Sequence, residues 1–175
     1  MLSLVYAPNV IFKKTAKAVT EVDDQIRIII DQMFEITEKE GAIGLAGNMV
    51  GILQRIIVIN WKINNVKLSM VNPEIIDFSD HMQEFKEASL SFPGIEANIT
   101  RPKKITVSYL DYQNKPQEME AEGFLATIIQ HEIDYLDGKV FIDHLSKIKR
   151  DRLLKKMQKF IKHNPPHIHN EHCNH

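Results

Sequence analysis

The 175-residue sequence has a single cysteine, Cys173, so no disulfide can form within one chain. It has no apolar run near the ~18 residues that a membrane-spanning helix requires. Residues 1–6 lack the basic flank and apolar core of a signal peptide. We therefore expect no membrane partner and a location in the cytoplasm or an organelle matrix.

Neither sign of charge dominates the chain. The 22 Lys and Arg residues nearly balance the 23 Asp and Glu residues, and the net charge of −1 argues against DNA binding through bulk charge. The composition, 43% hydrophobic and 26% charged, is typical of a folded protein. We predict a single domain over residues 1–162, followed by a flexible tail over residues 163–175.

The predicted tail is rich in histidine. It contains five of the eight histidines, the only cysteine and two prolines, with little apolar content. Such a tract binds transition metals weakly through its composition alone, since it has no fixed geometry or supporting hydrogen bonds. We expect weak metal binding there and no catalytic role.

Hydrophobic periodicity and turn residues predict the main elements. A helix over about 24–39 is expected to begin after Asp23 and to end at Gly41. Two more helices are predicted over about 124–136 and, after Ser146, over 147–162. Strands are predicted at 55–61, 66–78, 82–88, 105–110, 117–121 and 140–142, with 66–78 and 82–88 as a pair.

Residues 130–135 have the sequence Q-H-E-I-D-Y, one residue short of the zinc-hydrolase motif H-E-x-x-H. On a helix, that motif places two imidazoles on one face with the Glu as general base. Here His131 and Glu132 are present, and Tyr135 stands where the second His would be. A neutral phenol, with an ordinary pKa near ~10, is a poor ligand for a divalent metal.

Three separated segments together resemble the signature motifs of the peptide deformylase family, and the match covers nearly the whole chain. The segments are Gly44-Leu45-Ala46, Glu87-Ala88-Ser89-Leu90-Ser91 and Gln130-His131-Glu132-Ile133-Asp134-Tyr135-Leu136-Asp137-Gly138. In the family they read G-x-G-L-A-A-x-Q, E-G-C-L-S and Q-H-E-x-D-H-L-x-G. The resemblance implies an α+β fold, with mixed or antiparallel sheets around a central motif-bearing helix and a C-terminal helix.

The resemblance also implies an activity, the hydrolytic removal of the formyl group from the N-terminal methionine of nascent polypeptides. In the family, a divalent metal held by one Cys and two His activates a water, and a Glu moves the proton. The metal, a Gln side chain and a backbone N–H beside the Cys stabilise the oxyanion. Carried onto this sequence, this implies Glu132 as general base, His131 as a retained ligand and Leu90 as the backbone donor.

Three of the implied functional positions hold other residues. Ser89 replaces the Cys ligand, Tyr135 replaces the second His ligand, and Met49 replaces the oxyanion Gln. One His and one Glu do not hold a divalent metal tightly without organised partners. We therefore expect no cofactor at the active site, a catalytically inactive or severely impaired protein, and a hydrogen-bonded core network around His131 and Glu132.

We expect the chain to keep a peptide- or ribosome-binding role in a bacterial cytoplasm or an organelle matrix. By position, the walls of a methionine pocket are predicted to include Ile43, Gly44, Leu45, Leu125 and Ile129. The helix over 147–162 has a basic face, which is either an ordinary solvated surface or a ribosome contact. The expected partners are thus nascent peptide N-termini and the ribosome.

Two enzymatic alternatives stay open. The first is an active metallo-deformylase or amidohydrolase with unusual ligands for Fe, Zn or Ni, in which Tyr135 binds a ferric ion as phenolate or the tail donates a ligand. The second is a nucleophilic hydrolase that uses Ser89 and His131, since both occupy ligand positions that lie close together in the family.

Overall fold

The structure, a computed structural model, describes residues 1–166, in which two antiparallel sheets and three α-helices form an α+β fold. The strands are β1 (Gly44–Ala46), β2 (Ile56–Trp61), β3 (Val66–Phe78), β4 (Met82–Ser89), β5 (Phe92–Pro102), β6 (Lys104–Leu110) and β7 (Pro116–Glu122). The helices are α1 (Asp24–Glu40), α2 (Phe124–Leu136) and α3 (Lys147–His163).

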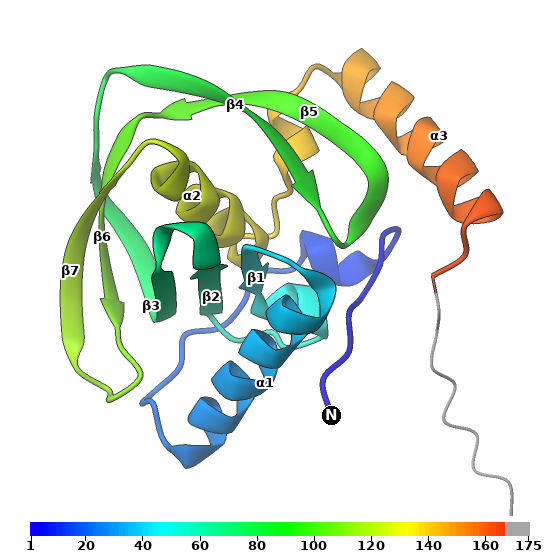
Figure 1. The fold of residues 1–175 in the computed structure, drawn as a ribbon. Coiled ribbons are helices and arrows are strands. Elements are labelled where there is room, and N and C mark those ends of the chain that lie inside the picture. Colours follow the sequence, from blue (N-terminus) through cyan, green and yellow to red (C-terminus); the bar gives the residue numbers. More distant parts are fainter. Residues whose placement is uncertain (167–175) are drawn as a thin grey trace, which may run out of the picture.

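One sheet has the strand order β1-β2-β3-β6-β7, and the other is the β4–β5 hairpin. Helix α2 contacts β1, β2 and β7 of the larger sheet and β5 of the hairpin, so it lies between the two sheets (Figure 1). Helix α3 lies outside, against β5 (Figure 1). The predicted fold class, with sheets around a central helix and a C-terminal helix, is confirmed.

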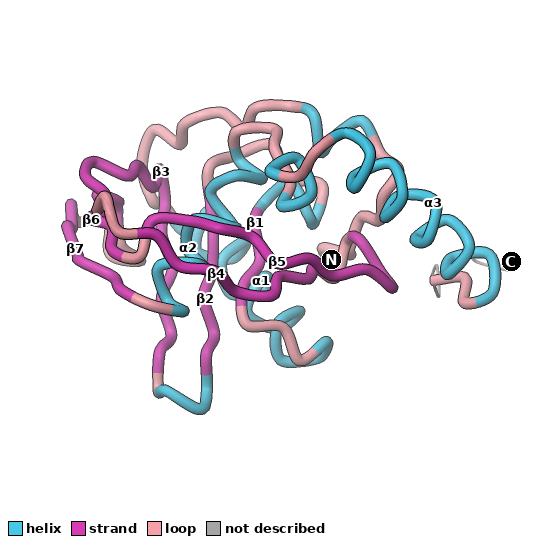
Figure 2. Tube along the Cα trace, turned by 90° about the horizontal axis from the view of Figure 1, so that it is seen from above, coloured by secondary structure: helices cyan, strands magenta, loops and turns pink. Residues whose placement is uncertain are grey.

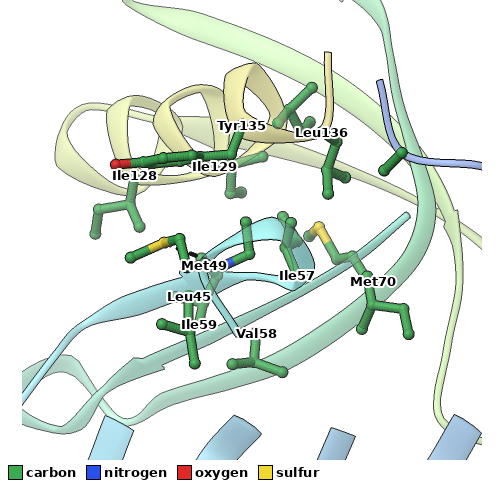
Figure 3. Packing of buried hydrophobic residues seen from close by; sticks show 14 of the residues in the cluster. Leu45, Met49, Ile57, Val58, Ile59, Met70, Ile128, Ile129, Tyr135 and Leu136 are labelled. Carbon is green, nitrogen blue, oxygen red and sulfur yellow. Dashed lines mark hydrogen bonds between the residues drawn. The ribbon is translucent and has the colours of Figure 1, made fainter. Parts of the chain in front are cut away.

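Helix α2 is buried on nearly all sides, and its buried residues include the polar Thr127, Gln130, His131 and Glu132 as well as apolar side chains. Ten of its 13 residues are buried. Figure 3 shows Ile129 and Tyr135 of α2 facing Leu45 of β1, Met49 of the 3-10 helix η2 (Gly47–Val50) and Ile57 of β2. This packing fixes the position of α2, and with it the position of the third motif.

The predicted helix boundaries are confirmed by their caps. The Asp23 carboxylate accepts a hydrogen bond from the Ile26 amide, and Gly41 ends α1 with a left-handed φ of 67°. Ser146 accepts from the Lys149 amide at the start of α3. Each cap supplies a partner for a helix-end group that the helix itself leaves unpaired.

Helix α3 is held on the hairpin by a close contact between Phe160 and Gly94. Gly94 has a φ of +78°, and a Cβ added there would lie 2.3 Å from the Phe160 ring. Met157 is also buried, and Leu153, Leu154 and Ile161 are partly buried against the core, so one face of α3 packs on the protein while the helix runs along its outside (Figure 2). Only a glycine at position 94 allows the ring to approach so closely.

Three predictions of secondary structure were wrong. Strands β3 and β4 are not paired, because β3 pairs with β2 and β6 while β4 pairs with β5. Strand β5 was not predicted from the sequence at all. Residues 141–144 form a 3-10 helix, η4 (Phe141–His144), in place of the predicted strand, and its N-terminus is capped by Asp143, which accepts from the Val140 amide.

The C-terminal helix extends to His163, one residue beyond the predicted domain boundary. Residues 167–175 of the predicted tail, with Cys173, lie outside the described residues, so the tail's flexibility and its weak metal binding stay predictions. Within residues 1–166, no helix is both long and apolar enough to cross a membrane.

Candidate active site

A pocket of about 460 Å³ opens where the three motifs meet, between β1, the β4–β5 turn and α2. Its volume is within the range of small-ligand sites. Most of its lining is apolar, and the polar groups come mainly from the second and third motifs. The lining residues are Gly41, Ala42, Ile43, Gly44, Met49, Lys86, Glu87, Ala88, Ser89, Leu90, Pro93, Phe124, Thr127, Ile128, His131 and Glu132.

The predicted wall residues divide into three groups. Ile43 and Gly44 line the pocket as predicted. Leu45 and Ile129 lie in the core with no exposed surface, and the partly buried Leu125 is also absent from the lining. The prediction was wrong for these three, because α2 turns Phe124, Thr127 and Ile128 toward the pocket instead.

His131 is oriented by a buried carboxylate. Its Nδ1 donates to Glu87 Oε1 at 2.7 Å, so Nε2 is the ring nitrogen left free of this bond. Burial lowers the pKa of His131, but the bond to Glu87 and the charge of Glu132 outweigh burial and raise it above its ordinary value. The bond fixes the ring and favours its charged form.

Arg101 completes this network. Its Nε and Nη2 donate to the two oxygens of Glu87 at 2.7 and 2.9 Å, and its Nη1 donates to Asp134 at 2.8 Å. Burial raises the pKa of Glu87, but the hydrogen bonds from Arg101 and His131 prevail and lower it. Glu87 is therefore an ionised, fully paired group that supports His131.

Glu132 is buried in the pocket wall, with 4% of its surface exposed. Its Oε2 has no hydrogen-bond partner among the described residues. Burial raises the pKa of Glu132 to about 7, in spite of the neighbouring charge of His131. Gly44 makes room for this side chain, since a Cβ at position 44 would lie 2.7 Å from Glu132 Oε1.

Ser89 and Tyr135, at the two replaced ligand positions, are bonded to each other. Their hydroxyl oxygens are 2.6 Å apart, and Ser89 also accepts from the Ser91 amide at 3.3 Å. Tyr135 has no exposed surface, and burial raises its pKa well above 10. The phenol is therefore neutral, which argues against the predicted alternative of a phenolate ligand.

The geometry also argues against the predicted Ser89–His131 nucleophile. The bonds of these residues in the described chain run from Ser89 to Tyr135 and from His131 to Glu87, and none joins Ser89 to His131. A serine nucleophile needs a base within hydrogen-bond reach. His131 thus belongs to the network of Glu87 and Arg101, and Ser89 and Tyr135 form a separate pair, whereas Oε2 of Glu132 has no hydrogen-bond partner among the described residues, so the network predicted around both His131 and Glu132 forms only in part.

Met49 lines the pocket at the implied oxyanion position. It is 1% exposed, and its sulfur accepts a weak hydrogen bond from the Ala46 amide at 3.5 Å. A thioether has no proton to donate. Leu90 lies in the turn between β4 and β5 and also lines the pocket, so its backbone N–H remains the candidate donor.

Arg101 and the aromatic wall residue Phe124 were not predicted as site residues from the sequence. Arg101 lies in β5, where buried and exposed residues largely alternate. That alternation, with Ile95, Ala97, Ile99 and Arg101 on one face, was the available signal for a strand with an inward-facing arginine.

Comparison with known proteins places the chain among deformylases. The family model described as polypeptide deformylase matches residues 1–151. A protein of Rickettsia conorii named peptide deformylase-like is 58% identical, over 98% of this chain and 95% of that protein. Peptide deformylase 1 of Pseudomonas syringae is 41% identical, over 91% of this chain and 95% of that protein.

Solved structures agree with this match. A crystal structure of peptide deformylase from Ehrlichia chaffeensis superposes with a TM-score of 0.87 and 36% identity, covering 94% of this chain and 98% of that one. The same enzyme in complex with actinonin also gives 0.87, at 38% identity, over 91% and 97% of the two chains.

These matches correct the prediction that no cofactor belongs at the site. The chain matches a family of metalloenzymes along most of its length, and the family's chemistry requires a divalent metal, so the prediction was wrong. The side chains nevertheless do not fit the implied ligand set. Ser89 and Tyr135 are neutral hydroxyls bonded to each other, and within residues 1–166 no three His, Cys, Asp or Glu residues are grouped to hold an ion.

Proposed function

The chain belongs to the peptide deformylase family, and on this basis we propose that it binds the N-terminal methionine of nascent polypeptides but deformylates them far more slowly than its relatives. The pocket supports the binding half of the proposal. Its walls are mostly apolar, and its volume of about 460 Å³ accommodates a methionine side chain and the start of a peptide.

The slow turnover rests on one observation, the 2.6 Å hydrogen bond between Ser89 and Tyr135. The two hydroxyls stand at positions that the resemblance assigns to metal ligands, and they bond to each other. A serine hydroxyl lacks the charge of a thiolate, and the buried phenol keeps its proton. Because the thioether of Met49 has no proton to donate, the backbone N–H of Leu90 is the remaining candidate donor to the oxyanion.

The retained residues have defined roles in this proposal. Glu132 supplies the carboxylate that accepts or returns a proton at the reacting group. The Glu87–Arg101 pair holds His131 in one orientation. Ile43, Phe124 and the other apolar wall residues position the methionine side chain. The loss of a single oxyanion donor costs on the order of 10²–10³ in rate, so the three replacements together predict a severe defect.

The test compares kcat/KM for formyl-methionyl peptides between this chain and its variant Ser89→Cys, Tyr135→His, Met49→Gln. Every assay contains added Fe²⁺ or Ni²⁺, so the supply of metal does not limit the result. We expect the triple variant to exceed the parent by about 10³-fold or more. The matched control is Met49→Gln alone, which restores the donor without the ligands and is expected to gain less than about tenfold.

Peptide deformylase 1 of Pseudomonas syringae, assayed in parallel, sets the scale of normal turnover. A parent kcat/KM within tenfold of that enzyme contradicts the proposal. So does a failure of formyl-methionyl and methionyl peptides alike to bind the parent chain.

We further propose that α3 contacts the ribosome. Seven Lys and Arg side chains of α3 are exposed, whereas Asp151 is the helix's single acidic residue and is paired with Lys147. Such a cationic surface suits the phosphates of RNA. The exposed residues are Lys147, Lys149, Arg152, Lys155, Lys156, Lys159 and Lys162.

Replacement of Lys155, Lys156 and Lys159 by Glu should abolish co-sedimentation with ribosomes at low salt. The matched control reverses three other exposed lysines, Lys39, Lys115 and Lys139, and so changes the net charge equally. Equal loss in both triple variants, or loss in neither, contradicts a contact through α3. Bacterial relatives support a bacterial cytoplasmic location, which stays a prediction.

A further inference from the structure

The pocket contains one phenyl ring among the described residues that line it, the ring of Phe124. Apart from the imidazole of His131, the other lining side chains are aliphatic or polar. Phe124 is only partly buried, so part of its ring is accessible from the pocket. The proposed function uses this residue only as an apolar wall, which an aliphatic side chain would form equally well, and leaves its aromatic character without a role.

The Phe124 ring is held in place by both sheets. Trp61, at the end of β2, packs against it edge-to-face, with the ring centroids 5.3 Å apart and the planes at 75°. Phe85 of β4 contacts it with a centroid distance of 5.4 Å. Gln83 of β4 holds the first turn of α2, because its Nε2 donates to the Gly123 carbonyl at 2.7 Å. Aromatic pairs of this kind fix a ring beyond what burial alone does, so the orientation of Phe124 is set before a ligand binds.

The position of Phe124 on α2 matches the reach of a methionine side chain. Ile128 lies about one turn before His131 and Phe124 about two turns before it, so the three residues form a row along one face of the helix. The sulfur of a formyl-methionine is five bonds from the formyl carbon, about 6 Å in an extended chain. A side chain that runs along this row from a formyl group at His131 therefore brings its sulfur close to the Phe124 ring.

A sulfur atom beside an aromatic ring gains an attraction that an aliphatic wall does not supply. Burial alone gives methionine no advantage over norleucine, in which a methylene group replaces the sulfur, because the methylene is the more apolar of the two. The two side chains are otherwise almost equal in length and shape. Since the ring is already ordered, the contact with sulfur forms without the cost of immobilising the phenyl side chain.

We propose that Phe124 determines a specificity of the pocket for a thioether side chain over an alkyl side chain of the same length. The inference rests on the proposed function, because it names the atom by which the same pocket recognises the first residue of a peptide. Ile43 and Ile128 supply apolar contact to either side chain, and Phe124 supplies the additional attraction for sulfur.

The test is isothermal titration of the full chain with formyl-methionyl-alanyl-alanine and with its norleucyl analogue. We expect the methionyl peptide to bind about threefold or more tightly, since a sulfur–aromatic contact corresponds to roughly two- to twelvefold in affinity. Equal binding, or tighter binding of the norleucyl peptide, overturns the inference alone. If neither peptide binds, with or without its formyl group, the proposed function fails and the inference fails with it, so the two failures are distinguishable.

Protein variants assign the preference to one residue. Phe124→Leu keeps an apolar wall and removes the ring, so the ratio of methionyl to norleucyl affinity should fall to one or below, whereas a loss of packing alone would weaken both peptides equally. The control, Phe34→Leu, makes the same change on α1 outside the pocket lining and should keep the ratio of the parent. A preference for the methionyl peptide that persists in Phe124→Leu contradicts the inference. The comparison of the two ligands on the parent chain stands even if this variant fails to fold.

Discussion

The two halves of the pocket use opposite chemistry. On one side, Glu87 and Arg101 form a buried ion pair that also fixes His131. On the other side, Ser89 and Tyr135 form a neutral hydrogen bond. Neither member of the charged pair can be removed without leaving the other ionised and buried, whereas the neutral pair can be exchanged as a unit. The charged half therefore serves folding whether or not the site is active.

The largest effect is expected from breaking the charged half. Arg101→Met removes the guanidinium that bonds both oxygens of the buried Glu87 and also the partly buried Asp134, and should lower the free energy of unfolding by about 3–5 kcal/mol. Urea denaturation measures it. Lys104→Met is the control, because Lys104 pairs with Glu120 at the surface and such a pair contributes about 0–1 kcal/mol. A loss below about 1 kcal/mol for Arg101→Met means that the two halves do not differ as described.

The next largest effect on the free energy of unfolding is expected from a change of pH, through the titration of Glu132. Its pKa in the folded protein is raised to about 7, so the native state keeps this proton to higher pH than the unfolded chain. Stability is then highest below the unfolded pKa of about 4.3 and falls as pH rises toward 7, by about 3 kcal/mol from this group.

The check is the stability of Glu132→Gln against that of the parent between pH 4.5 and 8. The variant should lack this fall, and the exposed control Glu118→Gln should keep it. The lowered pKa of Glu87 gives the opposite sign, since its contribution is lost as pH falls. Identical pH profiles for the parent and Glu132→Gln contradict the prediction.

Gly44→Ala tests whether the position of Glu132 is fixed. The new Cβ overlaps Glu132 Oε1 and forces a shift, so we expect a loss of about 1–3 kcal/mol in thermal unfolding and weaker binding of the methionyl peptide. Gly51→Ala is the matched control, because Gly51 does not line the pocket, a Cβ there makes only ordinary contact with Val5 at 3.9 Å, and the cost is the strain of its positive φ. If peptide affinity changes equally in both variants, Gly44 has no special relation to Glu132.

The smallest effect belongs to the neutral half. Ser89→Ala should cost about 1–2 kcal/mol, because it leaves the buried Tyr135 hydroxyl without its partner. Tyr135→Phe should cost about 1 kcal/mol, since the half-buried Ser89 hydroxyl keeps its bond from the Ser91 amide. The double variant removes both hydroxyls and should cost less than the sum of the two single changes. A double-mutant cycle by urea denaturation measures the difference. Strict additivity means that the hydrogen bond is not formed in solution.

The sequence predicted what depends on local signals. The N-caps at Asp23 and Ser146 were identified correctly, and the motif spacing led to the correct family. The prediction of the pocket walls on α2 failed, although a signal for the correct face was present. Ile128 and Thr127 lie three and four residues before His131 and so share its face of the helix, yet Ile129 was predicted where Ile128 lies.

The prediction of which strands pair with one another also failed. The partner of β4 is a strand whose alternation was overlooked, and Arg101 was missed with it. Hydrophobic alternation locates a strand but does not choose its neighbour, which is why β3 and β4 were paired wrongly. The absence of a partner at Glu132 is likewise a property of three-dimensional packing, since nothing in the residues around position 132 predicts it.

The bond between Ser89 and Tyr135 also constrains the evolution of the chain. A change to Cys at position 89 alone places a thiol against a buried phenol, and a change to His at position 135 alone leaves a gap where the phenol packs against Phe12. Each single substitution is thus expected to give a less stable protein before the second one completes the pair of metal ligands. We therefore expect a lineage that carries this pair to change what its pocket binds sooner than to gain the ligand set that the resemblance implies.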